Sequence, residues 1–332
     1  MDRKQNIELR DLSIGYKLRR GIKVVASGLD AIVQSGELTC LLGSNGVGKS
    51  TLLRTISAFQ PKLGGEIIVK GQEVEDYKER ELSKVIAVVL TERFADNNMT
   101  TYELISMGRS PYTGFWGRLE DEDKTAVERA IDLVRIEHLR YRMLHSLSDG
   151  ERQKAMIAKA LAQDTPIIIL DEPTAFLDFP SKVDMMQLLH RLSRETGKTI
   201  FLSTHDLELA LQVSDKIWLM DDDKKLHIGT PEDLALSGEL SRFFQQKEII
   251  FDEATGLFRI ENGYKREIKV LGHGHLFAMV RKALLRNRIL ANRSAESKEY
   301  IDTREGKIVL YRSDKAMGVE LQSIEQMLNE VV

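Results

Sequence analysis

The residues Gly43–Ser50 form the stretch with the clearest chemistry, because they read Gly-x-x-x-x-Gly-Lys-Ser. In such a phosphate loop the glycines let backbone N–H groups curl around a phosphate, and the following helix adds the favourable dipole of its N-terminus. Lys49 is expected to contact the β- and γ-phosphates of a nucleotide, and Ser50 is expected to give its hydroxyl to Mg²⁺. An accidental glycine-rich turn is disfavoured, since an apolar strand at 38–42 precedes the loop and a helix at 51–59 follows it. The nucleotide-binding residues expected here are Gly43, Ser44, Asn45, Gly46, Val47, Gly48, Lys49, Ser50 and Thr51.

Two carboxylates, Asp171 and Glu172, form a second candidate site directly after the apolar run Ile167–Leu170. Ligands bind outside the carboxyl ends of the strands in open α/β sheets, so both side chains stand where a substrate would lie. Asp171 is placed to hold Mg²⁺ through the water shell of the ion, and Glu172 is a candidate base for an attacking water. On its own, an apolar run followed by Asp-Glu is more often a strand that enters a polar turn. In a chain that also has a phosphate loop, the interpretation as a catalytic site is preferred.

Three further stretches, Leu147–Glu151, Leu177-Asp178 and Ser203–Asp206, identify the class. In order along the chain, these motifs resemble the ATP-binding subunit of ABC transporters, and the resemblance covers about residues 7–260. A phosphate loop alone is shared by many NTPases, whereas Leu-Ser-x-Gly-Glu ahead of Asp-Glu-Pro-Thr is close to diagnostic of this family. The resemblance implies ATP and Mg²⁺ as ligands and ATP hydrolysis as the activity.

The resemblance also implies roles for matching residues. Tyr16 occupies the place of the aromatic residue that stacks on adenine, and we prefer stacking to the alternative of a half-buried strand tyrosine. Ser148 and Gly150 match the residues that contact the γ-phosphate bound by the opposite subunit. His205 matches the histidine that senses the γ-phosphate, and Asp178 matches an aspartate at the subunit interface. The expected catalytic residues are Glu172, His205 and Lys49.

Each site of this family needs a phosphate loop from one subunit and the Leu-Ser-x-Gly-Glu signature from another. The chain holds one copy of each, which predicts a homodimer with two ATP molecules sandwiched between the subunits.

The sequence departs from the family pattern at two positions. Thr91 stands where a glutamine normally follows the strand and contacts Mg²⁺ or the attacking water, so either Thr91 or Glu92 is expected to substitute for it. The signature also has Asp149 where glycine is usual. A carboxylate facing the nucleotide would repel it, but at a helix start it can cap N–H groups and favour the dipole, and we prefer the capping interpretation.

The stretch Gly108–Gly114 reads GRSPYTG and is similar to a segment of the importers for iron–siderophore, haem and cobalamin. The segments Ala175–Phe179 and Gly229–Glu232 are similar to that group as well. This resemblance predicts a subunit that powers import by ATP-driven dimer closure coupled to a polytopic membrane permease, which a substrate-binding protein feeds. It predicts a peripheral location at the cytoplasmic face of the cell membrane. An exporter subunit or a non-transport ABC ATPase is the alternative.

The elements that must position these residues follow an α/β order. Short alternating apolar stretches at 7–16 and 23–33 predict a small, mixed β layer, and buried strands separated by helices predict a parallel sheet. The resemblance implies that residues 1–261 form the P-loop ATPase domain, with a helical subdomain over about 92–160. Residues 262–332 are expected to form a small α/β extension of unknown role, with strands at 267–271 and 307–311 and helices at 276–290 and 321–331.

Composition limits the remaining possibilities. The 332 residues are 42% hydrophobic and 30% charged, which is typical of a globular protein. The net charge of −3 provides no basic field for a nucleic acid, and none is expected as a partner. The first ten residues lack the apolar stretch of a signal peptide, and no apolar run approaches the length of a membrane-spanning helix. The single cysteine, Cys40, is expected to be a small buried residue.

Overall fold

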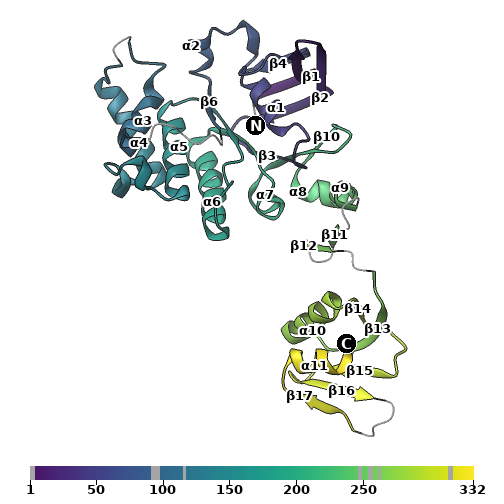
Figure 1. The fold of residues 1–332 in the computed structure, drawn as a ribbon. Coiled ribbons are helices and arrows are strands. Elements are labelled where there is room, and N and C mark those ends of the chain that lie inside the picture. The colour runs from purple at the N-terminus through teal and green to yellow at the C-terminus, as the bar shows by residue number, and fades with distance from the viewer. Residues whose placement is uncertain are drawn as a thin grey trace. The chain divides into compact units, whose positions relative to one another are not determined.

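A computed structural model of the chain describes residues 4–90, 98–114, 117–245, 249–252, 257–260, 263–312 and 317–332. The chain forms two compact units, Met1–Leu240 and Ser241–Val332 (Figure 1). This division lies ahead of the expected boundary between residues 261 and 262, and that boundary of the ATPase domain stays a prediction.

The first unit contains two sheets, and both were expected from the strand pattern. One is a small antiparallel layer in the order β2-β1-β4-β5. The other is a six-stranded sheet in the order β10-β9-β3-β8-β7-β6, parallel except for β10 at its edge. The fold class predicted from the sequence is therefore confirmed. The strands are β1 (Gln5–Leu18), β2 (Gly21–Gln34), β3 (Leu38–Gly43), β4 (Gly64–Val69), β5 (Gln72–Glu73), β6 (Ile86–Val89), β7 (Ile167–Asp171), β8 (Thr199–Ser203), β9 (Lys216–Met220) and β10 (Leu226–Gly229).

The parallel sheet supplies the centre of the core. Every residue of β7 and of β8 is buried, as expected for strands covered on both faces. Phe201 on β8 and Trp218 on β9 are fully buried, with ring centroids 4.8 Å apart. Cys40 on β3 is fully buried as predicted, and burial raises the pKa of its thiol to about 12. The helices of this part are α1 (Lys49–Ile56), α2 (Glu79–Leu82), α6 (Phe179–Thr196), α7 (Leu207–Val213) and α8 (Pro231–Leu236), with a 3₁₀ turn η1 (Val74–Asp76). The helix α9 (Glu239–Gln245) includes the division between the two units.

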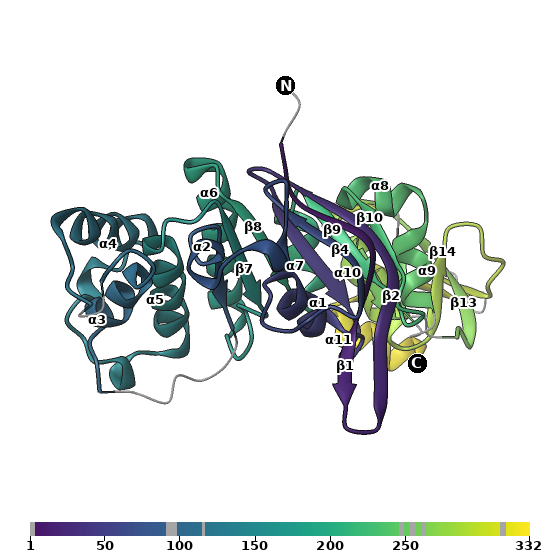
Figure 2. The ribbon, with the colours of Figure 1, turned by 90° about the horizontal axis from the view of Figure 1, so that it is seen from above.

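The helical subdomain lies on the opposite side of the parallel sheet from the antiparallel layer (Figures 1 and 2). Its helix α4 starts with three acidic residues that favour the N-terminal dipole, and it ends at Arg135 in a left-handed conformation. Within this subdomain α5 packs against both α4 and α3. Its elements are α3 (Thr101–Ser106), η2 (Met107–Arg109), α4 (Asp121–Val134), η3 (Glu137–Leu139), η4 (Leu144–Ser146) and α5 (Asp149–Ala162).

The second unit is an α/β fold, as expected, but it contains more strands than the sequence indicates. Its main sheet has the order β14-β13-β15-β16-β17, with β13 parallel to both of its neighbours. Buried residues of α10 and α11, among them Val280, Leu284 and Met327, pack on this sheet and form a separate core. The elements are β11 (Ile249–Asp252), β12 (Leu257–Ile260), β13 (Arg266–Leu271), α10 (Gly274–Arg286), β14 (Ile289–Asn292), β15 (Glu299–Asp302), β16 (Ile308–Arg312), β17 (Val319–Leu321) and α11 (Ile324–Val331).

Two helix bounds predicted for this unit are wrong. The helix expected at 276–290 ends at Arg286, because Arg288 has a φ of 60° and Ile289 begins a strand that pairs with β13. The helix expected at 321–331 begins only at Ile324, because Leu321 pairs in the sheet and the Ser323 hydroxyl caps the helix. In both places the apolar residues of a short strand continue the apolar pattern of the adjoining helix.

Candidate functional site

The phosphate loop joins β3 to α1, as its sequence predicts. Gly46 has a φ of 77° and Gly48 a φ of 127°, both in the region that favours glycine. A Cβ atom at Gly48 would also lie 2.6 Å from the Val25 side chain, so the loop needs glycine there for space as well. The Lys49 ammonium is buried and donates to the backbone oxygens of Gly43 at 3.0 Å and Ser44 at 3.3 Å. The lysine is therefore held inside the loop that it is expected to serve.

Ser50 and Asp171 lie together beside this loop, although they are far apart in the sequence. The Ser50 hydroxyl donates to Asp171 Oδ1 over 3.0 Å, and the Ser203 hydroxyl donates to the same oxygen over 2.6 Å. Asp171 ends β7 and is directly opposite Ser203 in the register with β8. A carboxylate and hydroxyl oxygens are the donors that Mg²⁺ prefers, so the chemistry of this set fits a magnesium ion.

Glu172 stands between two cation-forming side chains. Its Oε1 lies 3.9 Å from Lys49 Nζ, and its Oε2 lies 3.7 Å from His205 Nδ1. Its backbone has a φ of 47°, a conformation that non-glycine residues rarely adopt and that costs of order 1–3 kcal/mol. The Glu172 N–H holds that conformation by donating to the Ser203 carbonyl at 3.2 Å and to its hydroxyl at 2.9 Å. The structure thus brings the three residues expected to be catalytic to one place.

Tyr16 lies next to the same site, on the hairpin of β1 and β2. Its hydroxyl is 2.9 Å from the Thr51 hydroxyl on α1, and 40% of the tyrosine is exposed. The hydrogen bond fixes the end of the ring while a face stays accessible. This placement beside the phosphate-loop helix suits an aromatic platform for a base.

The signature residues lie at the start of α5. Ser148 is the N-cap, its hydroxyl accepts from the Glu151 N–H at 3.3 Å, and Glu151 accepts in return from the Ser148 N–H at 2.8 Å. This backbone hydrogen bond from Ser148 is the largest of the effects that lower the pKa of Glu151. The prediction that Asp149 caps the helix is wrong, because Ser148 occupies the cap. Asp149 is exposed in the first turn, where its charge favours the dipole.

Asp178 and Gly150 lie at neighbouring helix starts. The Asp178 carboxylate caps α6 by accepting from the Ser181 N–H at 3.1 Å. A Cβ at Gly150 would lie 3.7 Å from the Ser181 hydroxyl, so the first turns of α5 and α6 approach each other. The residues expected to act across a subunit interface are therefore grouped with each other.

The stretch Gly108–Gly114 is tied into the helical subdomain. A Cβ at Gly108 would lie 2.3 Å from the Lys159 carbonyl oxygen, so only glycine permits this approach to α5. Arg109 Nε donates to Asp123 Oδ1 over 2.8 Å, and both side chains are at most 9% exposed. Arg109 also donates to the Ala162 carbonyl at 2.9 Å and lies over the Tyr112 ring, 3.9 Å from its centroid. Packing within the subdomain thus accounts for much of this motif.

The structure adds contacts that the sequence motifs do not indicate. Ser203 holds both Asp171 and the Glu172 backbone, and Asp222 accepts from the Ser44 hydroxyl at 2.6 Å. Asp206 accepts from Lys182 and from Thr174. Ser203 ends a parallel strand and Asp222 lies just beyond the end of β9, and that position is the signal that could have found them.

Thr91 and Glu92 fall outside the described residues, so the substitution for the usual glutamine stays a prediction. Among residues that the structure describes, no helix is both long enough and apolar enough to cross a membrane.

Comparison with known proteins places the chain among transporter components. The ABC transporter family model matches residues 26–175. An uncharacterised ABC transporter ATP-binding protein of Methanocaldococcus jannaschii is 37% identical over 284 residues, covering 85% of this chain and 97% of that protein. Because this alignment is longer than the first unit, it extends into the second. The probable siderophore transport system ATP-binding protein of Bacillus subtilis is 35% identical over 69% of this chain and 82% of its own length.

A solved structure shares the fold of the first unit. It is an ATP-binding cassette captured as a dimer in a post-hydrolysis state with bound ADP and Pi. It is 25% identical with a TM-score of 0.59, and the match covers 68% of this chain and 98% of that one.

Proposed function

The chain belongs to the ATP-binding proteins of the ABC transporter family, and from that membership we propose that it hydrolyses ATP to power the import of iron–siderophore complexes. The observation that carries the hydrolytic part is the position of Glu172 between Lys49 and His205, beside the Ser50–Asp171 pair. The cargo is supported by the relative that is named for siderophore transport and by the GRSPYTG stretch.

In the proposed reaction Glu172 accepts a proton from the attacking water. The water oxygen bonds to the γ-phosphorus as the bond to the β–γ bridging oxygen breaks, and ADP and phosphate leave. The strained Glu172 backbone, fixed by Ser203, aims the carboxylate, and Lys49 supplies positive charge to the β- and γ-phosphates. His205 contacts the γ-phosphate and holds Glu172 from its other side.

Ser50 and Asp171 are the residues that would hold Mg²⁺. When bound, the ion supplies positive charge that neutralises the phosphate oxygens. Tyr16 stacks on the adenine, and its bond to Thr51 keeps the ring next to the phosphate loop.

Two copies of the chain are proposed to close on two ATP molecules. Ser148, Gly150 and Asp178 form one group at the starts of α5 and α6, and this group would meet the phosphate loop of the second copy. The dimeric cassette described above supports this arrangement. The permease would receive the movement through the helical subdomain, so the protein would sit peripherally at the cytoplasmic face of the cell membrane. A substrate-binding protein would take part only through the permease.

The experiment that tests the cargo is uptake by cells that express this chain together with its proposed partners, the permease and the substrate-binding protein. Labelled iron–siderophore, haem and cobalamin are offered separately, and Lys49→Ala serves as the background without ATPase activity. We expect uptake of the iron–siderophore to depend on Lys49. Lys49-dependent uptake of haem or cobalamin alone would contradict the cargo and leave the ATPase proposal intact.

A further inference from the structure

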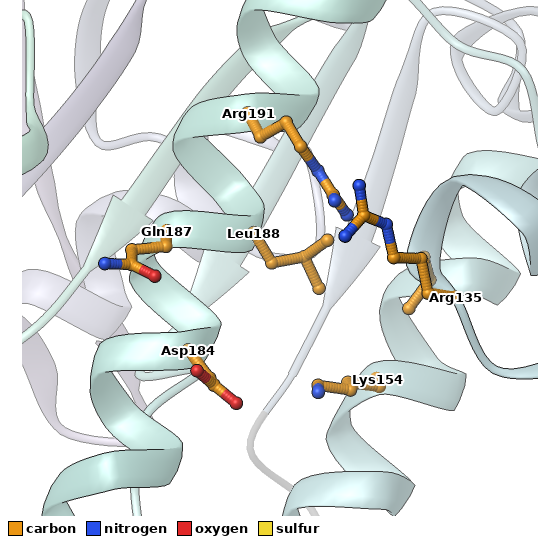
Figure 3. Close-up of a pocket in the computed structure, with 7 residues that line it drawn as sticks. Arg135, Lys154, Asp184, Gln187, Leu188 and Arg191 are labelled. Carbon is orange, nitrogen blue, oxygen red and sulfur yellow. The ribbon is translucent and has the colours of Figure 1, made fainter.

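A pocket in the first unit, away from the phosphate loop, gathers positive charge from three helices. It has a volume of about 410 Å³ and lies between the end of α4, the first half of α5 and the middle of α6. Its polar lining includes Arg135, Lys154, Asp184 and Arg191 (Figure 3). The volume lies within the range of about 300–1,000 Å³ typical of small-molecule sites.

The charges of this pocket are not balanced. Three cationic side chains face one carboxylate, Asp184. Figure 3 shows the guanidinium groups of Arg135 and Arg191 pointing toward each other, while Lys154 and Asp184 point toward each other lower in the pocket. In the described part of the chain no salt bridge joins either arginine to a carboxylate. Two neighbouring guanidinium groups without a counter-charge repel each other, and an anion placed between them would relieve that repulsion.

One of the two arginines, Arg191, is held in place before any ligand arrives. Arg191 donates from Nη2 to the Leu133 carbonyl at 3.0 Å, which anchors it to the last turn of α4. This bond gives Arg191 a structural role, because a cation at the C-terminal end of a helix is stabilised by the helix dipole. The bond uses one of the five N–H donors of the Arg191 guanidinium, so the others can serve a ligand. It gives no structural role to Arg135 or Lys154. Leu188 supplies an apolar wall.

We propose that this pocket binds a phosphate group, either as free inorganic phosphate or as the phosphomonoester of a small molecule. Guanidinium groups match phosphate oxygens with paired hydrogen bonds, and Lys154 adds a point charge. Asp184 disfavours an anion in its own part of the pocket, so the phosphate belongs at the end formed by the two arginines.

A ligand here would connect the helical subdomain to the core. Arg135 and Lys154 come from the helical subdomain, whereas Arg191 comes from α6. The helices α5 and α6 start at the signature and at Asp178, so the phosphate would restrain the two elements that carry the proposed interface group. This site is independent of the cargo and of the ATPase mechanism proposed above.

The test is isothermal titration calorimetry on the full chain at low ionic strength, with the phosphate loop filled by ADP. Inorganic phosphate and glycerol 3-phosphate are titrated in separate arms. Arg135→Asn removes one guanidinium, and asparagine tolerates the left-handed backbone at this position, where φ is 61°. Arg129→Gln removes an exposed charge from the same helix outside the pocket and serves as the matched control.

We expect binding in at least one arm, weakened about tenfold or more by Arg135→Asn and unchanged by Arg129→Gln. The arm that binds more tightly identifies the source, free phosphate or phosphomonoester. Absence of binding in both arms overturns the proposal. Binding that Arg135→Asn leaves unchanged overturns it equally, because that phosphate would then occupy the nucleotide site. The melting temperatures of the two variants are measured as well, and equal values exclude unfolding as the cause of a difference in binding.

Discussion

The ion pair between Arg109 and Asp123 gives the sharpest prediction about the helical subdomain. Arg109→Met keeps the volume of the side chain but removes its charge from a pair in which both partners are at most 9% exposed. The substitution leaves the Asp123 carboxylate buried and also removes the bond to the Ala162 carbonyl. Breaking a buried pair on one side costs about 3–5 kcal/mol of unfolding free energy, because an uncompensated charge stays inside.

The assay is differential scanning calorimetry of the full chain at neutral pH. At about 2–4 °C per kcal/mol for a unit of this size, the transition of the first unit should fall by roughly 6–20 °C. In the double variant Arg109→Met/Asp123→Asn no buried charge is left unpaired. It should therefore be more stable than the sum of the single effects by more than about 1 kcal/mol.

The same pair makes a pH prediction. Burial by itself would raise the pKa of Asp123, but hydrogen bonds from Arg109 and from the Glu120 N–H outweigh burial and lower it below its ordinary value of 3.8. A lowered pKa contributes stability above the unfolded value, and that stability is lost as the pH falls through the folded value. The difference between the parent and Arg109→Met should therefore shrink as the pH falls below 3.8. A loss under about 1 kcal/mol at neutral pH, as at an exposed pair, or strictly additive effects would refute this reasoning.

Two further predictions concern the nucleotide site. Ser203→Ala removes the hydroxyl that donates to Asp171 and accepts from the Glu172 N–H. Steady-state kinetics should show kcat reduced about tenfold with little change in KM for ATP. An unchanged kcat would exclude this positioning role. Tyr16→Ala should weaken ATP binding about tenfold by calorimetry, whereas Tyr16→Phe, which loses only the bond to Thr51, should bind nearly as the parent does. Equal losses in the two Tyr16 variants would favour the hydrogen bond over stacking.

Much of the site could be predicted because its parts are local or follow strand order. The phosphate loop needs only a strand, its glycines and a helix start, and one continuous stretch of sequence contains all three. Asp171 ends β7 and His205 follows β8. Since parallel neighbours end at one edge, their meeting with Lys49 after β3 follows from the topology. The role of Ser203 could not be predicted, because it depends on the register of β7 with β8.

Other features required the tertiary structure. Nothing local marks Asp123 as the partner of Arg109, because their pairing depends on how α4 packs against the turn that carries Arg109. Asp149 and Ser148 are both good capping residues, and the backbone geometry selected the serine. In the second unit, β14 and β17 are only four and three residues long. Strands this short show too little alternation of apolar and polar residues to be distinguished from the adjoining helices.

The measurement that tests the central claim most directly is the rate of ATP hydrolysis by Glu172→Gln, with the oligomeric state followed by light scattering. Glu195→Gln, the same change at an exposed position of α6, is the control. If Glu172 is the base, hydrolysis should fall by about 10²-fold or more while ATP still binds, and an ATP-dependent dimer should accumulate. Hydrolysis at the parent rate in Glu172→Gln would contradict the account.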